Sequence, residues 1–181
     1  MPRLPENMHT HHSIPVRPAV AKYLRRKLSL AEGQPYQLSK KSQVGRLLYH
    51  LFRNPQEDRQ YIISEETHPG RFPLTISHQL NWLNGCRYLS AQGIHDFNRQ
   101  VEDMLEEEFL TTVKTLADHG VQFETKQVAL RFMSTYELTE EDLTLDALIK
   151  AYYRFRKAQR MGQNRANNIP NCPARQLQAA A

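Results

Sequence analysis

The sequence predicts a mainly α-helical protein with a small β-hairpin, an α+β fold built as one compact domain with flexible ends. Hydrophobic residues make up 40% of the 181 residues, which is enough for a core. Only 7 residues are glycine and 24% are charged, a composition that favours helices over a β-sandwich. Apolar residues recur at helical spacing along most of the chain, and short β-like runs occur only between residues 60 and 89.

The N-terminal part predicts a flexible segment and then a pair of basic helices. Residues 1–13 are expected to be disordered, and residues 14–17 extended, because a residue that precedes proline avoids the helical region. Pro18 suits the first turn of a helix, where its missing N–H costs nothing. A second helix is expected to begin after Ser39 or Ser42, either of which can cap it, and the pair spans residues 14–55.

Residues 60–89 predict the β-hairpin. The runs at 60–64 and 72–77 are β-like, and the segment between them is rich in turn-forming residues. Pro73 should confine its strand to a sheet edge or to a strand start, because proline cannot donate to a central ladder. The Asn84-Gly85 pair predicts a turn into a third short strand at 87–89.

Residues 90–120 predict one long acidic helix. Ser90 can cap its start, and Gly120 marks its end. Its apolar residues form a single stripe, and most of its acidic residues lie off that stripe. A helix of this length is either the spine of the domain or a dimerisation element, so a homo-oligomer formed through residues 90–120 is expected as one possibility.

Residues 125–161 predict a helix-turn-helix-like segment, followed by a disordered tail at 162–181. A short helix, a turn that contains Leu138, and a longer helix from Asp146 to about Met161 follow the order of that motif. The acidic run 140–142 departs from it, since carboxylates at the start of a recognition helix repel phosphates. DNA contacts are therefore expected further along the last helix, and an ordinary helical hairpin is the alternative.

Charge is strongly segregated along the chain. Residues 1–50 carry nine Lys or Arg and two acids, and residues 96–146 carry four bases and thirteen acids. Residues 147–181 carry seven bases and no acid. Two basic ends that flank an acidic helix predict contact with a polyanion, most simply DNA. The residues predicted to contact nucleic acid are Arg17, Lys22, Arg25, Arg26, Lys40, Lys41, Lys150, Tyr153, Arg154, Arg156, Lys157 and Arg160.

No pattern indicates catalysis, a metal site or a cofactor. His9, His11 and His12 lack a carboxylate or thiol partner in a flexible segment, which makes them a poor metal site. There is no glycine-rich phosphate loop and no hydrolase or metalloprotease motif. Without such a motif, we expect a protein that is not an enzyme. Two cysteines, no apolar leader at the N-terminus and no membrane-length apolar run predict that it is soluble and cytoplasmic.

The C-terminal stretches 132–143 and 148–154 resemble the C-termini of small accessory or regulatory proteins of phages and mobile elements in Bacteroidetes-type bacteria. The resemblance covers about a fifth of the chain, and it implies a DNA-associated role without catalytic residues. The sequence thus predicts a DNA-binding protein, regulatory or accessory in function. The alternative is a protein–protein adaptor or structural assembly component, in which the acidic helix of one subunit meets the basic end of another.

Overall fold

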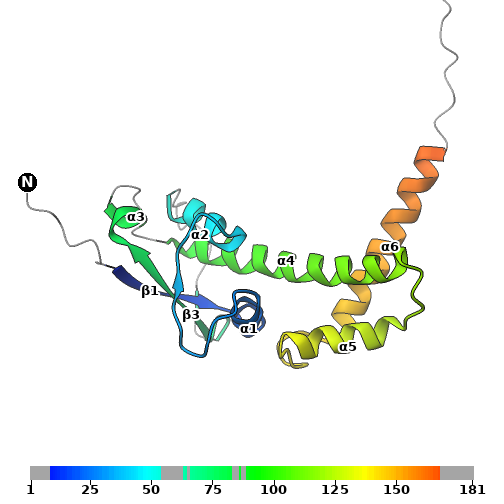
Figure 1. The fold of residues 1–181 in the computed structure, drawn as a ribbon, viewed down its shortest axis with the longest axis horizontal. Coiled ribbons are helices and arrows are strands. Elements are labelled where there is room, and N and C mark those ends of the chain that lie inside the picture. Colours follow the sequence, from blue (N-terminus) through cyan, green and yellow to red (C-terminus); the bar gives the residue numbers. More distant parts are fainter. Residues whose placement is uncertain (1–8, 54–62, 65, 83–85, 87–88, 168–181) are drawn as a thin grey trace, which may run out of the picture.

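The structure is a computed structural model that describes residues 9–53, 63–64, 66–82, 86 and 89–167 (Figure 1). It confirms the predicted class, mainly α with a small sheet. The strands are β1 (His9–Val16), β2 (Tyr36–Gln37) and β3 (Gly70–Ser77). The helices are α1 (Pro18–Lys27), α2 (Gln43–Arg53), α3 (His78–Trp82), α4 (Ala91–Asp118), α5 (Thr125–Thr135) and α6 (Leu145–Asn167).

The sheet joins segments that lie far apart in the sequence. Its order is β1-β3-β2, with β3 in the centre. β1 pairs with β3 in antiparallel register from His9 opposite Ser77 to Val16 opposite Gly70, and β2 pairs parallel to β3 beside Leu74 and Thr75. The sheet is therefore held together by long-range pairing and does not form a local hairpin.

Several predictions for the β region are wrong. Residues 9–13, expected to be disordered, form the first five residues of β1. β3 supplies their partner strand, and the rest of β1 is anchored in the core by the buried Ile14 and Val16. In the predicted hairpin, residues 63–64 are not part of a strand, and 60–62 lie outside the described residues. Of the expected third strand, Leu89 has no regular structure, and 87–88 lie outside the described residues.

Pro73 lies in the central strand, contrary to the prediction of an edge or a strand start. The carbonyl of Thr75 accepts a hydrogen bond of 2.9 Å from Leu38 N–H, so the backbone groups of Thr75 face β2. Backbone groups two residues apart in a strand face the same side, which places the ring nitrogen of Pro73 on this side as well. β2 pairs only from Leu74 onward, so no ladder hydrogen bond is lost at Pro73.

The helix boundaries largely confirm the predicted caps. The Ser42 and Ser90 hydroxyls accept hydrogen bonds of 2.9 and 3.1 Å from the N–H groups of Gly45 and Gly93. Pro18 opens α1, and Gly120 follows α4 with a φ of 67°. α6 is longer than predicted, since residues 162–167, assigned to the disordered tail, continue the helix. These residues include Gln, Arg and Ala, which favour helices, and residues 168–181 lie outside the described part.

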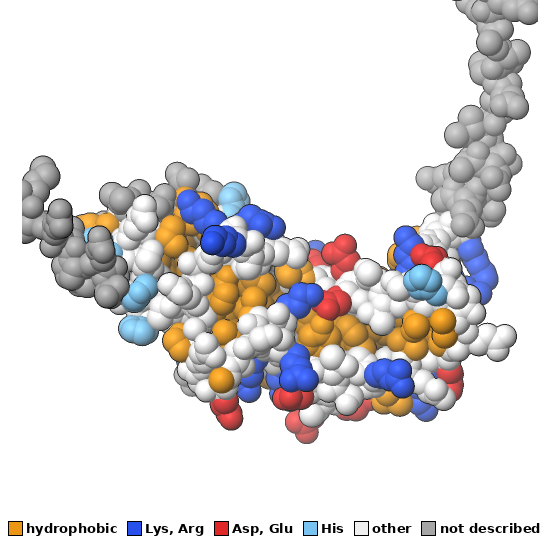
Figure 2. Space-filling view, viewed as in Figure 1, with side chains coloured by type: hydrophobic (Ala, Val, Ile, Leu, Met, Phe, Trp, Pro, Cys, Tyr) orange, Lys and Arg blue, Asp and Glu red, His pale blue; other side chains and the backbone are white. Residues whose placement is uncertain are grey.

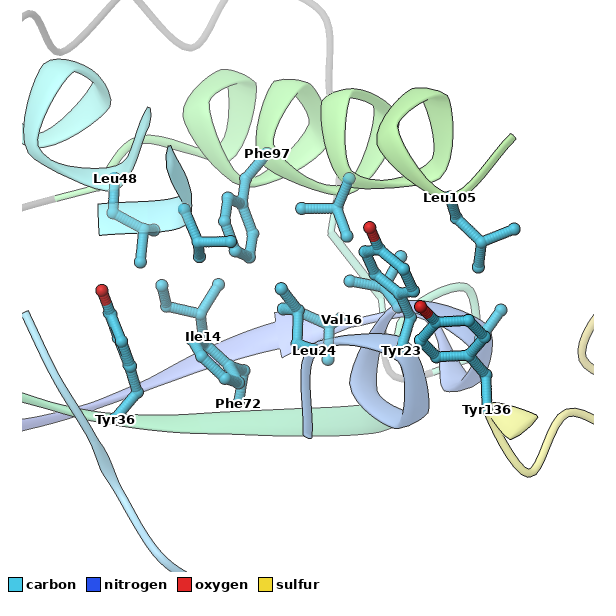
Figure 3. Close-up of a cluster of buried hydrophobic side chains, with 14 of the residues drawn as sticks. Ile14, Val16, Tyr23, Leu24, Tyr36, Leu48, Phe72, Phe97, Leu105 and Tyr136 are labelled. Carbon is cyan, nitrogen blue, oxygen red and sulfur yellow. The ribbon is translucent and has the colours of Figure 1, made fainter. Parts of the chain in front are cut away.

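α4 is the spine of the molecule. Its buried residues Phe97, Val101, Leu105, Phe109 and Val113 form one stripe. The first half of α4 covers one face of the sheet beside α1 and α2, and its second half packs against α5 and α6 (Figure 1). Figure 3 shows side chains of β1, β3 and α1 directed toward α4 and α2. The apolar stripe of α4 is thus covered within the chain, as expected for a spine.

Candidate nucleic-acid interface

Four of the side chains predicted to contact nucleic acid form ion pairs within the chain: Arg17, Lys22, Lys150 and Arg154. Lys40 lies over the ring of Tyr49, with Nζ 4.0 Å from the ring centroid. These contacts matter for DNA binding. A cation that already has a partner in the protein contributes less binding free energy on contact with a phosphate than an unpaired cation does.

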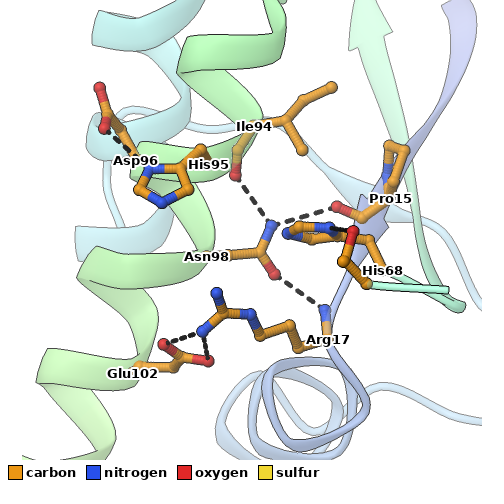
Figure 4. A network of polar contacts seen from close by, with 9 residues as sticks. Pro15, Arg17, His68, Ile94, His95, Asp96, Asn98 and Glu102 are labelled. Atoms are coloured by element: carbon orange, nitrogen blue, oxygen red, sulfur yellow. Dashed lines mark hydrogen bonds and ion pairs between the residues drawn. The ribbon is translucent and has the colours of Figure 1, made fainter. Parts of the chain in front are cut away.

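Arg17 has a structural role at the junction of β1 and α1. Its guanidinium donates to both carboxylate oxygens of Glu102 on α4, at 2.8 and 2.7 Å. Its backbone N–H donates to Asn98 Oδ1 at 2.9 Å, and Asn98 Nδ2 donates to the carbonyls of Pro15 at 3.2 Å and Ile94 at 2.8 Å (Figure 4). Arg17 and Asn98 therefore tie the strand-to-helix turn to α4.

His68 belongs to the same polar cluster and is buried. Its Nδ1 lies 2.8 Å from Thr67 Oγ1, and its Nε2 has no hydrogen-bond partner among the described residues. Burial lowers the pKa of His68, and the positive charge of Arg17 and the proximity of His95 lower it further. His68 is accordingly neutral in the folded protein at neutral pH.

Two lysines of α1 are also held by acids. Lys22 Nζ lies 2.6 Å from an Asp142 oxygen in the α5–α6 connection, and Lys27 Nζ lies 2.5 Å from a Glu108 oxygen on α4. Glu108 also accepts hydrogen bonds from the hydroxyls of Tyr23 and Tyr136. Burial alone would raise the pKa of Glu108, but these donors outweigh burial and hold its pKa below the ordinary value.

The acids of α4 between residues 102 and 108 lie between the two basic helices and pair with both. Glu102 pairs with Arg17, directly before α1, Glu108 pairs with Lys27 of α1, and Glu106 lies 3.8 Å from Arg154 of α6. Figure 2 shows Lys and Arg side chains in separate groups, over α2 and beside α6, with acidic side chains between them. On this face the cations of the two basic ends therefore do not form one continuous positive surface.

Six of the predicted cations remain exposed, with no hydrogen bond or ion pair of their side chains among the described residues: Arg25, Arg26, Lys41, Arg156, Lys157 and Arg160. The last three lie on α6 together with Tyr153, whose side chain is 57% exposed. Positions 153, 156, 157 and 160 share one helical face, because residues three, four and seven apart lie close together. We call these four residues the basic stripe of α6.

The basic stripe lies opposite the face by which α6 is anchored. Leu148 and Ala151 are buried, and Phe155 is half-buried beside α4. Beyond this contact the C-terminal part of α6 projects past α4, away from the sheet (Figure 1). The stripe is thus carried on an ordered helix and points away from the body of the protein.

The geometry of α5 and α6 differs from that of a compact helix-turn-helix. The two helices pack together, but residues 136–144 separate them, whereas the motif has a turn of three or four residues. Glu140 accepts a hydrogen bond of 3.2 Å from Leu145 N–H, and Asp142 accepts hydrogen bonds from the N–H and hydroxyl of Thr139. Carboxylates thus surround the start of α6. The helix-turn-helix interpretation stays a prediction.

Asn98 and Glu108 are key polar residues that the sequence did not single out. Asn98 had a visible signal, because it lies four residues after Ile94 and three before Val101, so a polar residue occupies a position within the apolar stripe of α4. Glu108 had none, since it lies in a run of three glutamates, and its neighbours Tyr23 and Tyr136 come from distant segments.

The chain matches no protein-family model, no curated protein and no solved structure. Within the described residues there is no group of three or more His, Cys, Asp or Glu side chains arranged to hold a metal ion. None of the helices in the described part is long and apolar enough to cross a membrane.

Proposed function

We propose that this protein is a non-enzymatic DNA-binding protein, regulatory or accessory in role, that contacts duplex DNA through the basic stripe of α6. The observation that carries the proposal is the state of Arg156, Lys157 and Arg160. All three are exposed on one helical face and have no partner among the described residues. An α-helix fits the major groove, and unpaired Arg and Lys neutralise phosphates.

The rest of α6 supports this proposal. No acidic residue follows Asp146 in the helix, and Asp146 is itself paired with Lys150 at 2.7 Å. Tyr153 adds an exposed aromatic ring with a hydroxyl that can donate to a phosphate. The side chains of Arg17 and Lys22, in contrast, form ion pairs with Glu102 and Asp142, so we do not include them in the proposed contact surface.

The test is fluorescence anisotropy with a labelled 20-base-pair duplex at several salt concentrations. Three phosphate contacts predict a log–log slope of affinity against salt of about −2.7. The double variant Arg156→Glu with Arg160→Glu should weaken binding at least about ten-fold, because it replaces two attractive contacts by repulsive ones.

The matched control is Lys114→Glu with Lys126→Glu, which changes the net charge equally at exposed positions of α4 and α5 outside the stripe. This control should bind nearly as well as the wild type. Absence of binding by the wild type at low salt would refute the proposal. Equal weakening in the two double variants would show that net charge alone matters, and that the stripe is not the site.

A second function, assembly through charge complementarity, is favoured by one observation. Asp103 is exposed on the rim of a pocket of about 800 Å³ between α1, α4 and α6, whose floor includes Leu105 and Leu148. In this hypothesis the basic stripe of a second copy contacts that rim. Light scattering at low and high salt separates the two functions, because assembly predicts a mass that falls with salt in the absence of DNA.

A further inference from the structure

We propose that a pocket between α1, the loop at residues 28–35 and β3 binds a phosphate group. The pocket has a volume of about 340 Å³, near the lower end of the range for small-molecule sites. It lies apart from the basic stripe, and the proposal does not depend on DNA binding by α6.

The pocket exists because the sheet is incomplete at this point. β2 pairs with β3 only at Leu74 and Thr75, so no strand of the described residues lies beside the stretch of β3 from Arg71 to Pro73 on that side. The loop and the second half of α1 close the space where a longer β2 would continue. This hollow is therefore built by three separate elements.

The charge of the pocket favours an anion. Arg25 from α1 and Arg71 from β3 both line it, and none of its described lining residues is acidic. The Arg25 side chain is exposed and has no hydrogen bond or ion pair among the described residues, so its planar set of N–H donors is available to a ligand. A guanidinium matches the oxygens of phosphate in a bidentate geometry.

The apolar part of the lining limits the ligand further. Leu30 and Phe72 contribute to the wall, and Gln34 adds an amide at the loop. A phosphate held by Arg25 would leave room beside this wall for a sugar or base. The shared chemistry is a phosphate group on a nucleotide, either free or within a nucleic-acid backbone.

The test is an NMR titration of the full-length chain with inorganic phosphate, at fixed pH and with potassium chloride balancing the ionic strength. Saturable shifts are expected for the amides of Arg25, Gly33 and Arg71. The variant Arg25→Ala should weaken phosphate binding at least about ten-fold, because it removes a charge-assisted hydrogen-bond donor. Arg25→Lys keeps the positive charge but loses the planar set of N–H donors. Its affinity for phosphate should lie between those of the wild type and Arg25→Ala.

Arg26→Ala is the matched control. Arg26 is adjacent on α1 and is also exposed, but it does not line the pocket. The Arg26→Ala variant should bind phosphate with an affinity within about two-fold of that of the wild type. Shifts that stay linear with phosphate concentration, or an equal loss in Arg25→Ala and Arg26→Ala, would overturn the proposal. The amide spectrum of each variant shows that it is folded.

Two further arms distinguish the sources of the phosphate. If the pocket holds a backbone phosphate of DNA, Arg25→Ala should reduce the salt slope of duplex binding by about 0.9. If it holds a free nucleotide, that slope should not change, and adenosine monophosphate should bind more tightly than inorganic phosphate. The Arg156→Glu, Arg160→Glu variant should still bind inorganic phosphate with the affinity of the wild type. A failure of DNA binding by α6 is therefore distinguishable from a failure of this site.

Discussion

Asn98 shows how one buried polar side chain fixes the start of the fold. It is 1% exposed, and it bonds the N–H of Arg17 and the carbonyls of Pro15 and Ile94. Asn98→Ala leaves backbone groups of the β1–α1 turn without partners, which costs more than the hydrogen bonds themselves contribute. We expect the free energy of unfolding to fall by about 2–4 kcal/mol in urea denaturation.

Asn81→Ala is the control for this prediction. Asn81 Nδ2 donates to Thr10 Oγ1 at 2.7 Å near the surface, where water can replace the lost partner. Its loss should cost less than about 1 kcal/mol. If both alanine variants had the same small effect, the β1–α1 turn would not depend on Asn98.

At the scale of elements, α2 contains a glycine that its position in a helix does not explain. A Cβ at Gly45 would lie 1.8 Å from the carbonyl oxygen of Ser39 and 2.6 Å from the Tyr36 hydroxyl. The first turn of α2 must therefore approach the backbone that follows β2. Gly45→Ala should destabilise the protein by about 2–3 kcal/mol, although the same change in an open helix stabilises by about 0.5–1 kcal/mol.

The thermal midpoint of Gly45→Ala, compared with that of Gly93→Ala, provides the measurement. At Gly93 the nearest atom to an added Cβ is Leu89 Cδ1 at 2.8 Å, the end of a flexible side chain that can move. Gly93→Ala should therefore change stability by less than about 1 kcal/mol. An unchanged midpoint for Gly45→Ala would mean that the approach of α2 to Ser39 is not tight.

The sequence predicted the helices better than the strands, for a physical reason. The stripe from Val44 to Phe52 and the caps Ser42 and Ser90 are local signals, and each describes its own helix. β1 is defined by β3, which follows much later in the chain, so residues 9–13 show no strand pattern of their own. The two residues of β2 are too few for any period to be visible.

The candidate site was predicted less completely than the fold. The sequence placed Tyr153, Arg156, Lys157 and Arg160 on the last helix, where the structure has them, because they follow helical spacing. It did not separate them from Arg17 and Lys22, whose partners Glu102 and Asp142 come from distant segments. Charge composition is visible in a sequence, but the pairing of charges depends on the tertiary fold.

At the scale of the whole molecule, ion pairs connect α1 and the residue before it to α4 and to the α5–α6 connection. Glu108 and Asp142 hold Lys27 and Lys22, and Glu102 holds Arg17. For Asp142, as for Glu108, burial would raise the pKa, but hydrogen bonds from Lys22 and Thr139 hold it below the ordinary value. Ionised carboxylates therefore stabilise the folded state.

These groups predict two pH windows of instability. The lowered pKa of His68 means that the unfolded chain binds a proton below about pH 6.5 while the folded protein resists protonation, so stability falls as the pH drops below that value. The lowered pKa values of Glu108 and Asp142 stabilise the fold above their unfolded values, near 4.5 and 3.8, and this stabilisation is lost as the pH falls through their folded values.

Urea denaturation between pH 7.5 and 3.5 measures both windows, and two variants assign them. Burial lowers the pKa of His12 as well as that of His68, so both rings contribute to the first window. His68→Gln removes one of them and should reduce the slope between pH 6.5 and 5 by up to about 1.4 kcal/mol per pH unit. Glu108→Gln removes a carboxylate that three side chains share, so it should lower stability at pH 7 and reduce the further loss below pH 4.5.

A free energy of unfolding that stays constant from pH 7.5 to 4 would contradict the first window. A Glu108→Gln protein as stable as the wild type at pH 7 would show that the carboxylate does not hold α1 against α4.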